Sequence, residues 1–168
     1  ALEAFCKFVK EYPNFEFRIV GVTNQSDRYN EKVRAYIQRH ELPVVYMGPL
    51  SHAALLHQFQ SCTAHVLPSI SEPFYFEGFG LVHLEANSCG ALTIGTKGSA
   101  NEEIIAEGMS GFLVPQNNPA AVASAMRSAI EKISLEKERV REQCVKHARK
   151  FSWRNSVASI RRAYRQDY

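Results

Sequence analysis

The sequence predicts an α/β domain with a doubly wound, mainly parallel sheet. Short apolar runs, typical of strands covered on both faces, alternate with longer segments whose apolar residues recur at helical spacing. Such alternation favours parallel strands joined by crossover helices, with ligands at the carboxyl ends of the strands. The chain has 168 residues, of which 45% are hydrophobic, and is large enough to bury one core. We therefore expect a single Rossmann-like domain over residues 1–168, with a C-terminal helix over 151–168.

The first part of the chain is expected to alternate helices and strands. Prolines, glycines and changes of apolar period set the limits of each element. Ser51 can cap the helix that follows the second strand. The inward face of the charged helix over 27–40 should carry Tyr29, Val33, Tyr36 and Ile37. In order, the pattern predicts a helix over 1–11, a strand over 15–21, a helix over 27–40, a strand over 44–47, a helix over 51–60 and a strand over 64–68.

The second part begins with a helix that starts at about Gly80 and stops at Gly90. Pro119 opens a long helix further on, and F-S-W at 151–153 introduces the last one. The buried face of the helix at Gly80 should consist of Leu81, Leu84, Ala86, Ser88 and Cys89. After that helix, the pattern predicts a strand over 91–95, a short helix over 102–106, a turn and strand over 108–115, and helices over 119–132, 134–150 and from 153 onward.

Composition excludes several classes of protein. No apolar run approaches the ~20 residues that a membrane-spanning helix needs, and the N-terminus lacks the regions of a signal peptide, so a cytosolic location is the default expectation. Cys6, Cys62, Cys89 and Cys144 are irregularly spaced, which favours buried free thiols over a zinc site or disulfides.

The acidic residues exclude two further readings. Of the 17 acids only Asp27 and Asp167 are aspartates, and neither follows an apolar strand. A phosphoacceptor receiver domain and a metal-dependent Asp-x-Asp transferase are therefore not expected. The chain also lacks the G-x-x-x-x-G-K-[ST] phosphate loop and the third glycine of a dinucleotide fingerprint.

The start of the helix at Gly80 is the candidate binding site. It follows an apolar strand and a loop in which Gly78 and Gly80 allow close approach of the backbone. The amides of Phe79, Gly80, Leu81 and Val82 have no intrahelical partners, and the positive end of the helix dipole lies behind them. This arrangement is an anion site, most simply for phosphate.

Two carboxylates flank this site in the sequence. Glu77 lies just before the helix and Glu85 lies just over a turn inside it. A carboxylate does not bind a phosphate, but it accepts strong hydrogen bonds from neutral sugar hydroxyls. A capped helix with two solvated glutamates is the alternative, and the chemistry alone leaves both readings open.

The string E-G-F-G-L-V-H-L-E-A-N-S-C-G at residues 77–90 resembles, without a gap, the Glu-x7-Glu signature of family 4 retaining glycosyltransferases, which have the two-domain B-type fold. Similar matches flank it: F-R-I-V-G at 17–21, V-Y-M-G at 45–48, and E-I-I-A-E-G-M-S-G-F-L-V-P at 103–115. Their order corresponds to the family's C-terminal, nucleotide-sugar-binding domain. The resemblance covers nearly the whole chain but does not indicate the sugar.

The resemblance implies transfer of a hexose from a nucleotide diphosphate sugar to a saccharide or lipid-linked acceptor, with retention of configuration and without a metal or other cofactor. Glu77 would be the catalytic residue and would hold hydroxyls of the donor sugar, while Glu85 would hold the ribose. The backbone at the helix start would take sugar and phosphate oxygens. The donor-binding residues implied in this way are Glu77, Gly78, Phe79, Gly80, Leu81, Val82, Glu85, Met47, Gly48 and Leu50.

For two loops an alternative to a role in donor binding stays open. Met47, Gly48 and Leu50 are implied near the nucleotide base, because in the family the backbone after this strand lies close to the base. An ordinary strand-to-helix turn is the alternative. Before Glu77, residues 72–76 are inserted relative to the family's shortest form, and their three aromatic side chains either pack under the loop or form a wall of the donor pocket.

The chain opens with a helix, whereas the family's domain begins with a strand and a glycine-rich turn bearing an Arg and a Lys that contact the diphosphate. We expect this first strand to be missing, because the residues before Ala1 were cut off or are disordered. Acceptor recognition is expected in a missing N-terminal domain. The isolated chain should then bind the donor without turnover.

More than half of the 20 lysines and arginines fall between Lys132 and Arg165. A solvated helix face explains this bias, and peripheral contact with an anionic membrane that carries a lipid-linked acceptor is the alternative. No nucleic-acid partner is expected. Two other functions stay open: a nucleotide-sugar-binding module without transfer activity, and a nucleotide-sugar epimerase of the same architecture.

Overall fold

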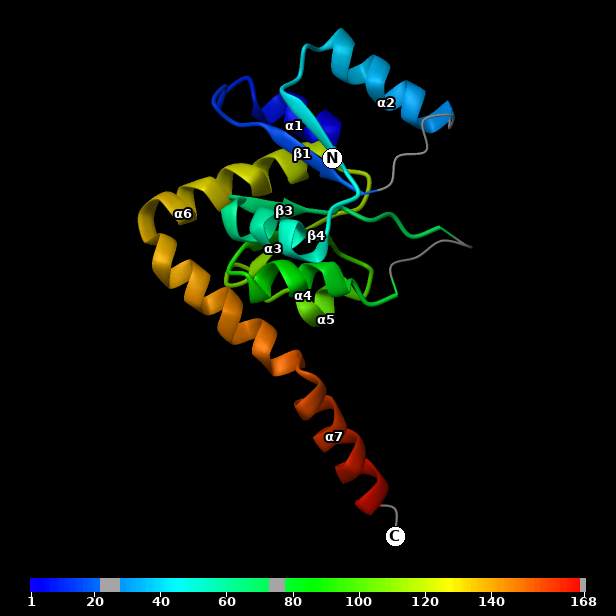
Figure 1. The fold of residues 1–168 in the computed structure, drawn as a ribbon, viewed down its shortest axis with the longest axis vertical. Coiled ribbons are helices and arrows are strands. Elements are labelled where there is room, and N and C mark those ends of the chain that lie inside the picture. Colours follow the sequence, from blue (N-terminus) through cyan, green and yellow to red (C-terminus); the bar gives the residue numbers. More distant parts are fainter. Residues whose placement is uncertain (22–27, 73–77, 167–168) are drawn as a thin grey trace.

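Helices and strands alternate along the chain, as the sequence predicts (Figure 1). The computed structural model describes residues 1–21, 28–72 and 78–166. The elements are α1 (Leu2–Phe8), β1 (Phe17–Val20), α2 (Arg28–Arg39), β2 (Val44–Gly48), α3 (His52–Ser61), β3 (Ala64–Val66), α4 (Leu81–Ser88), β4 (Leu92–Thr96), α5 (Asn101–Ile104), β5 (Gly111–Val114), α6 (Pro119–Ala148), the 3₁₀ helix η1 (Arg149–Phe151) and α7 (Trp153–Gln166).

The described strands pair in parallel, which confirms the predicted α/β class. They are distributed over two sheets, with the orders β1-β2 and β3-β4-β5. All five residues of β4 are buried, because this strand lies between two neighbours and under helices. In the described part of the chain no ladder joins β1 to β3.

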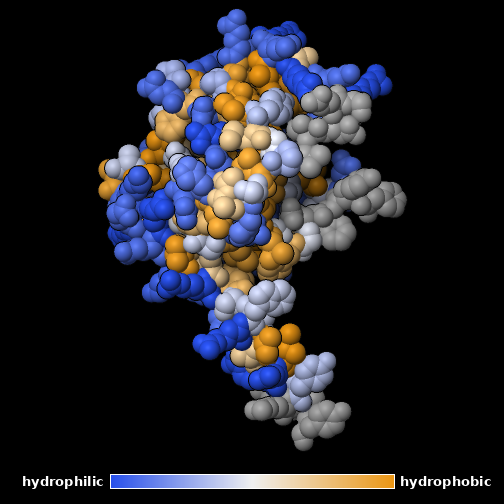
Figure 2. Space-filling view, in the orientation of Figure 1, coloured by the Kyte–Doolittle hydropathy of each residue, from blue (hydrophilic) through white to orange (hydrophobic). Residues whose placement is uncertain are grey.

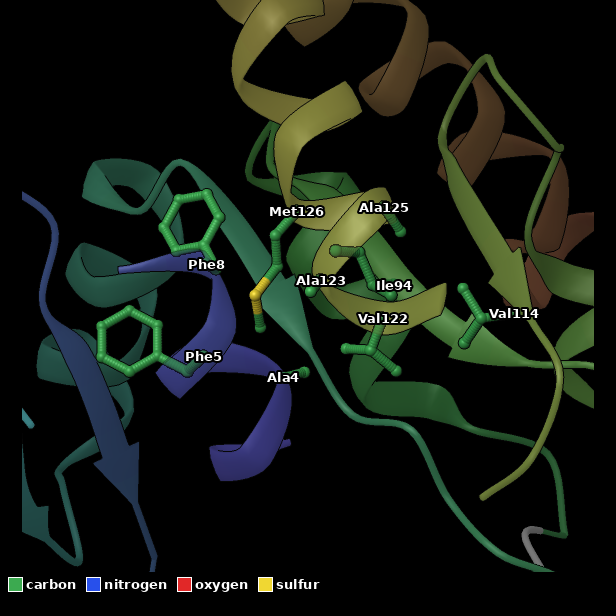
Figure 3. Packing of buried hydrophobic residues seen from close by; sticks show 9 residues of the cluster. All are labelled: Ala4, Phe5, Phe8, Ile94, Val114, Val122, Ala123, Ala125 and Met126. Atoms are coloured by element: carbon green, nitrogen blue, oxygen red, sulfur yellow. The ribbon is translucent and has the colours of Figure 1, made fainter. Parts of the chain in front are cut away.

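One hydrophobic cluster connects the two sheets. Figure 3 shows Phe5 and Phe8 of α1 beside Met126 of α6, with Ile94 of β4 close by. Side chains from both sheets pack against this cluster, among them those of β1, β2 and β3. The ring of Phe5 lies 5.3 Å from that of Phe17 in β1, measured between centroids. Helix α1 therefore holds the β1-β2 sheet against the sheet that leads into the candidate site.

Helix α6 is broken close to the place that the sequence predicted. The break was expected between 132 and 134, and the non-helical dihedral angles lie at Glu136 (φ −142°, ψ 43°), where two helical halves meet across a kink. The Ser134 hydroxyl donates to the Glu131 carbonyl 2.8 Å away, so it bonds within the helix and does not cap a new one. The kink lets both halves of α6 bury an apolar face, with Ala129 on one side of it and Val140 on the other.

Arg141 links the second half of α6 to the C-terminal ends of α3 and α4. Its guanidinium donates to the Gln60 carbonyl at 3.1 Å and to the Cys89 carbonyl at 3.3 Å. These carbonyls lie at the C-terminal ends of α3 and α4, where a positive charge is favourable. The contact fixes the end of α4 opposite to the candidate site.

All four cysteines are free thiols, as predicted, although only Cys144 is fully buried. Burial raises the pKa of Cys62 to about 11 and that of Cys144 to about 12. Both side chains therefore stay protonated near neutral pH and are weak nucleophiles.

Two helices are more exposed than the sequence suggested. In α2 no residue is fully buried, and Tyr29, which was expected to point inward, is 70% exposed. Tyr29 lies in the first turn of the helix, whereas Val33, Tyr36 and Ile37 further along are half-buried.

Helix α7 projects from the body of the domain (Figure 1) and carries an exposed apolar stripe of Trp153, Val157, Ile160 and Tyr164. In Figure 2 apolar and basic residues lie side by side on this helix. The polar face is solvated, as one reading of the sequence predicted, but the apolar face is exposed as well. Among the described residues, no helix is both long and apolar enough to cross a membrane.

Candidate functional site

The segment that follows β3 is tied to the next two strands before it reaches the candidate site. The Leu67 amide donates to the Ile94 carbonyl at 3.0 Å, and the Thr96 hydroxyl donates to the Ser69 carbonyl at 2.7 Å. The side chain of Gln116, just after β5, accepts a hydrogen bond from the Ser71 amide at 2.8 Å. These bonds hold the loop at the carboxyl ends of β4 and β5, where ligands bind in open α/β sheets.

Gly80 begins α4 in a conformation that only glycine adopts easily. It is the N-cap residue, with φ 75° and ψ 39°, and having no side chain it leaves the helix start uncapped. A Cβ placed on Gly80 would lie 2.6 Å from Asn101 Oδ1 and 3.1 Å from His83 Cδ2. The first turn of α4 therefore packs directly against α5, and the expectation that glycine is needed here for close approach is confirmed.

The sequence predicted four amides without partners at the start of α4, the amide face of this helix, and the structure bears this out for two of them within the residues that it describes. The His83 amide donates to the Gly80 carbonyl at 2.9 Å, whereas the amides of Leu81 and Val82 have no acceptor among the described residues. Phe79 and Leu81 are 41% and 61% exposed, so the start of the helix lies at the surface. This geometry suits an anion or another ligand that accepts hydrogen bonds.

Two residues of α4 were assigned to the wrong face. Leu81 and Ser88 were expected on the buried face, but Leu81 is largely exposed at the first helical position and Ser88 is exposed at the last one. The face against the domain carries polar as well as apolar residues, namely His83, Leu84, Ala86 and Asn87. Helical spacing alone does not reveal which side of the first turn the rest of the domain covers.

Of the two glutamates of the signature, Glu85 lies within the described residues and Glu77 does not. Glu85 is exposed one turn after Leu81, on the same side of α4, and it forms no ion pair with a described residue. Its position fits a ligand-binding carboxylate and a solvated one equally well. Glu77 and the three aromatic residues at 74–76 lie outside the described residues, so their predicted roles stay predictions.

Met47 and Gly48 line a hollow of about 540 Å³ between β2 and α2, together with Tyr46, Arg34 and other residues of these elements. Gly48 has a left-handed conformation (φ 65°), and its carbonyl accepts a hydrogen bond from the Gly21 amide at 3.0 Å. Leu50 does not line this hollow. The last residues of β2 thus border a hollow at the surface of the domain.

Two polar groups near α4 were not foreseen from the sequence. The imidazoles of His65 and His83 meet edge to face, with ring centroids 5.1 Å apart. Burial, with a smaller contribution from His83, lowers the pKa of His65 to about 3, so this ring is neutral near pH 7. Asn101 is fully buried beside Gly80. A histidine or an asparagine on an otherwise apolar face was the one signal available in the sequence.

Comparison with known proteins identifies the family. The model of the family described as "Glycosyl transferases group 1" matches residues 1–151. A D-inositol 3-phosphate glycosyltransferase from Acidothermus cellulolyticus is 30% identical over 98% of this chain and 37% of its own length. An uncharacterized glycosyltransferase from Methanocaldococcus jannaschii is 26% identical over 91% of this chain and 41% of its own length.

Solved structures share the fold. Anabaena HepE in complex with UDP superposes with a TM-score of 0.72 at 20% identity, over 86% of this chain and 39% of HepE. A glycosyltransferase from Rickettsia africae superposes with a TM-score of 0.77 at 20% identity, over 98% of this chain and 42% of its own. The chain spans well under half the length of these relatives. The resemblance inferred from the signature is confirmed, and the chain belongs to the group 1 glycosyl transferases.

Proposed function

We propose that this chain supplies the donor site of a transferase that moves a hexose from a nucleotide diphosphate sugar to a saccharide or lipid-linked acceptor, with retention of configuration. The observation that carries the proposal is the start of α4, where the amides of Leu81 and Val82 have no acceptor among the described residues, at the carboxyl ends of parallel strands in a member of this family. The UDP in the structure of Anabaena HepE supports a nucleotide diphosphate as the leaving group.

The chemistry that we propose is mostly stabilisation and positioning of the leaving group. Negative charge develops on the diphosphate as the bond to the sugar breaks, and the N-terminus of α4 is oriented to neutralise such charge without reorganisation. Glu77 holds hydroxyls of the sugar, and Glu85 holds the ribose. The backbone from Gly78 to Val82 takes sugar and phosphate oxygens, and the turn after β2, with Met47, Gly48 and Leu50, faces the base.

The partners follow from the same proposal. The acceptor is recognised by a part of the protein beyond this chain, which spans only 37% of the length of the Acidothermus relative. The exposed apolar stripe and the arginines of α7 support a peripheral contact with the cytoplasmic face of a membrane. Vesicle flotation with and without anionic lipid measures that contact directly.

Calorimetric titration of the chain with UDP-, GDP- and ADP-sugars tests the proposal. We expect nucleotides of one base to bind. The amide face contacts the phosphates, which all three ligands share, whereas the β2 turn contacts the base, in which they differ. An absence of binding for all of them contradicts the proposed donor site. In the full-length protein, release of nucleoside diphosphate separates the alternatives: a transferase releases it only when an acceptor is present, an epimerase does not need an acceptor, and a binding module releases nothing.

Binding of the nucleotide sugar is expected to be independent of metal ions. The described residues contain no group of three or more His, Cys, Asp or Glu that could hold a metal ion, and the sequence has no paired aspartates. The amide face then supplies the positive potential that Mg²⁺ supplies in other nucleotide sites. Affinities measured by calorimetry in EDTA and in Mg²⁺ should agree, and a tenfold gain with the metal would contradict the prediction.

Glu85→Gln is expected to weaken binding of the nucleotide about ten- to a hundredfold, with or without the sugar attached. A ribose contact is present in both ligands, and removing a hydrogen bond to a charged group costs about 1.5–3 kcal/mol. Calorimetry with nucleoside diphosphate and with the nucleotide sugar measures both losses. Glu138→Gln, an equally exposed change on α6, is the control and should bind both ligands like the parent. Unchanged affinity in Glu85→Gln would show that Glu85 is merely solvated.

A further inference from the structure

Asn101 lies behind the N-terminus of α4 and is completely buried. Its carboxamide fits between two glycines of other elements. Asn101 Oδ1 is 2.6 Å from the position that a Cβ would take on Gly80, and Nδ2 is 3.0 Å from the corresponding position on Gly95 of β4. Both glycines leave the space that this carboxamide fills, and it is directed at the residue that begins the amide face.

The carboxamide of Asn101 is unusual because neither of its polar atoms has a hydrogen-bond partner within the described part of the chain. Asn87, on α4, is equally buried, but its Nδ2 donates to the carbonyls of Ala91 and Ser110, each at 2.8 Å. Burial of an unpartnered amide opposes folding, and a leucine of similar size would fill the same space without that penalty. Packing therefore explains why residue 101 is of this size but not why it is polar.

We propose that Asn101 is a ligand-binding residue of the site at the N-terminus of α4. Its Oδ1 faces Gly80 in the free chain, and a half-turn of the carboxamide, which no hydrogen bond among the described residues opposes, brings Nδ2 to that side, where it donates a hydrogen bond to a phosphoryl oxygen of the bound diphosphate. Two independent observations meet at Gly80: the helix amides without acceptors, and the buried side chain without a partner, both among the residues that the structure describes. Backbone amides and an asparagine Nδ2 are all hydrogen-bond donors, so together they select a ligand with several acceptor oxygens close together.

The inference rests on the proposed function and names a further residue of the same site. Because the carboxamide is out of contact with water in the free chain, the ligand oxygen reaches it by displacing atoms at the start of α4. The penalty of keeping the amide unpartnered is then relieved on binding. The free chain is less stable than its packing allows, and part of that difference reappears as affinity.

The test uses two substitutions that remove the carboxamide but differ in volume. Asn101→Leu keeps the volume and removes an unpartnered polar group, so its thermal midpoint without ligand should rise by a few degrees. Asn101→Ala leaves a cavity, so its midpoint should fall. Calorimetry with the nucleoside diphosphate that binds the parent should show the same loss in both variants, about tenfold, because both lack the donor.

Asn87→Leu is the matched control. It leaves the carbonyls of Ala91 and Ser110 without their donor, so it should lower the thermal midpoint while the folded protein binds the ligand like the parent. If affinity follows volume, with Asn101→Leu binding like the parent and Asn101→Ala weakly, Asn101 is a packing residue and the inference is wrong. A parent chain that binds no nucleotide at all would overturn the proposed function as well, so the two failures are distinguishable.

Discussion

The full-length protein with Glu77→Gln is expected to lose hexosyl transfer, by about a hundredfold or more, while its affinity for plain nucleoside diphosphate stays close to that of the parent. If Glu77 holds hydroxyls of the donor sugar, it fixes the anomeric carbon in line with the acceptor, and a small misplacement of reacting atoms costs about a hundredfold in rate. The diphosphate itself makes no such contact. Initial rates of transfer, with calorimetry for both ligands, measure the two effects separately.

The alternatives for Glu77 give different results. A glutamate that only lies near a helix start contributes about 0.3–1 kcal/mol through the helix dipole and has no effect on transfer. Equal weakening for diphosphate and for sugar diphosphate would place Glu77 at the phosphates. Unaltered turnover would remove it from the site.

Gly111→Ala is expected to destabilise the domain by more than about 3 kcal/mol, a large part of the about 5–15 kcal/mol by which a folded domain is typically stable. A Cβ on Gly111 would collide with the Thr93 carbonyl oxygen and would lie 2.9 Å from the Thr93 hydroxyl and 3.0 Å from Ile105 Cγ2. The nearest of these atoms is backbone, so the clash is relieved only if β5 moves away from β4. Chemical denaturation followed by circular dichroism gives the free energy of unfolding.

Gly108→Ala is the control for this prediction. Gly108 has a left-handed conformation (φ 69°), but no described atom lies within 4 Å of the position that a Cβ would take there, so only the conformational cost of about 1 kcal/mol applies. A similar loss in both variants would show that Gly111 is needed for its dihedral freedom and not for the approach of the strands.

The order and type of the elements could be predicted from the sequence because they depend on local patterns. The apolar run at β4 and the glycines around α4 marked the centre of the sheet and the start of the helix. The break in α6 was predicted between 132 and 134 and lies at Glu136, because local patterns locate a helix boundary only to within a few residues.

The candidate site was predictable in its backbone but not in its side chains. The amide face follows from where a helix begins, and the signature marks that place. Leu81 was assigned to the wrong face, since helical spacing describes periodicity and not which side of the first turn the rest of the domain covers. Asn101 could not be foreseen, because it matters only through Gly80 and Gly95, which come near it when three separate segments fold together.

Because the strands form two separate sheets, the two parts of the domain differ in the free energy needed to open them. The part formed by β1, β2 and α2 is attached mainly through partly buried residues such as Phe17 and Val44, and α2 contributes no fully buried residue. Its opening therefore requires less free energy than global unfolding, so its backbone amides exchange with solvent first and those of β4 last. A nucleotide bound at α4, as proposed, would stabilise the β3-β4-β5 part, so the shift that it causes in a melting curve reports the stability of that part. One melting midpoint therefore does not describe the whole chain.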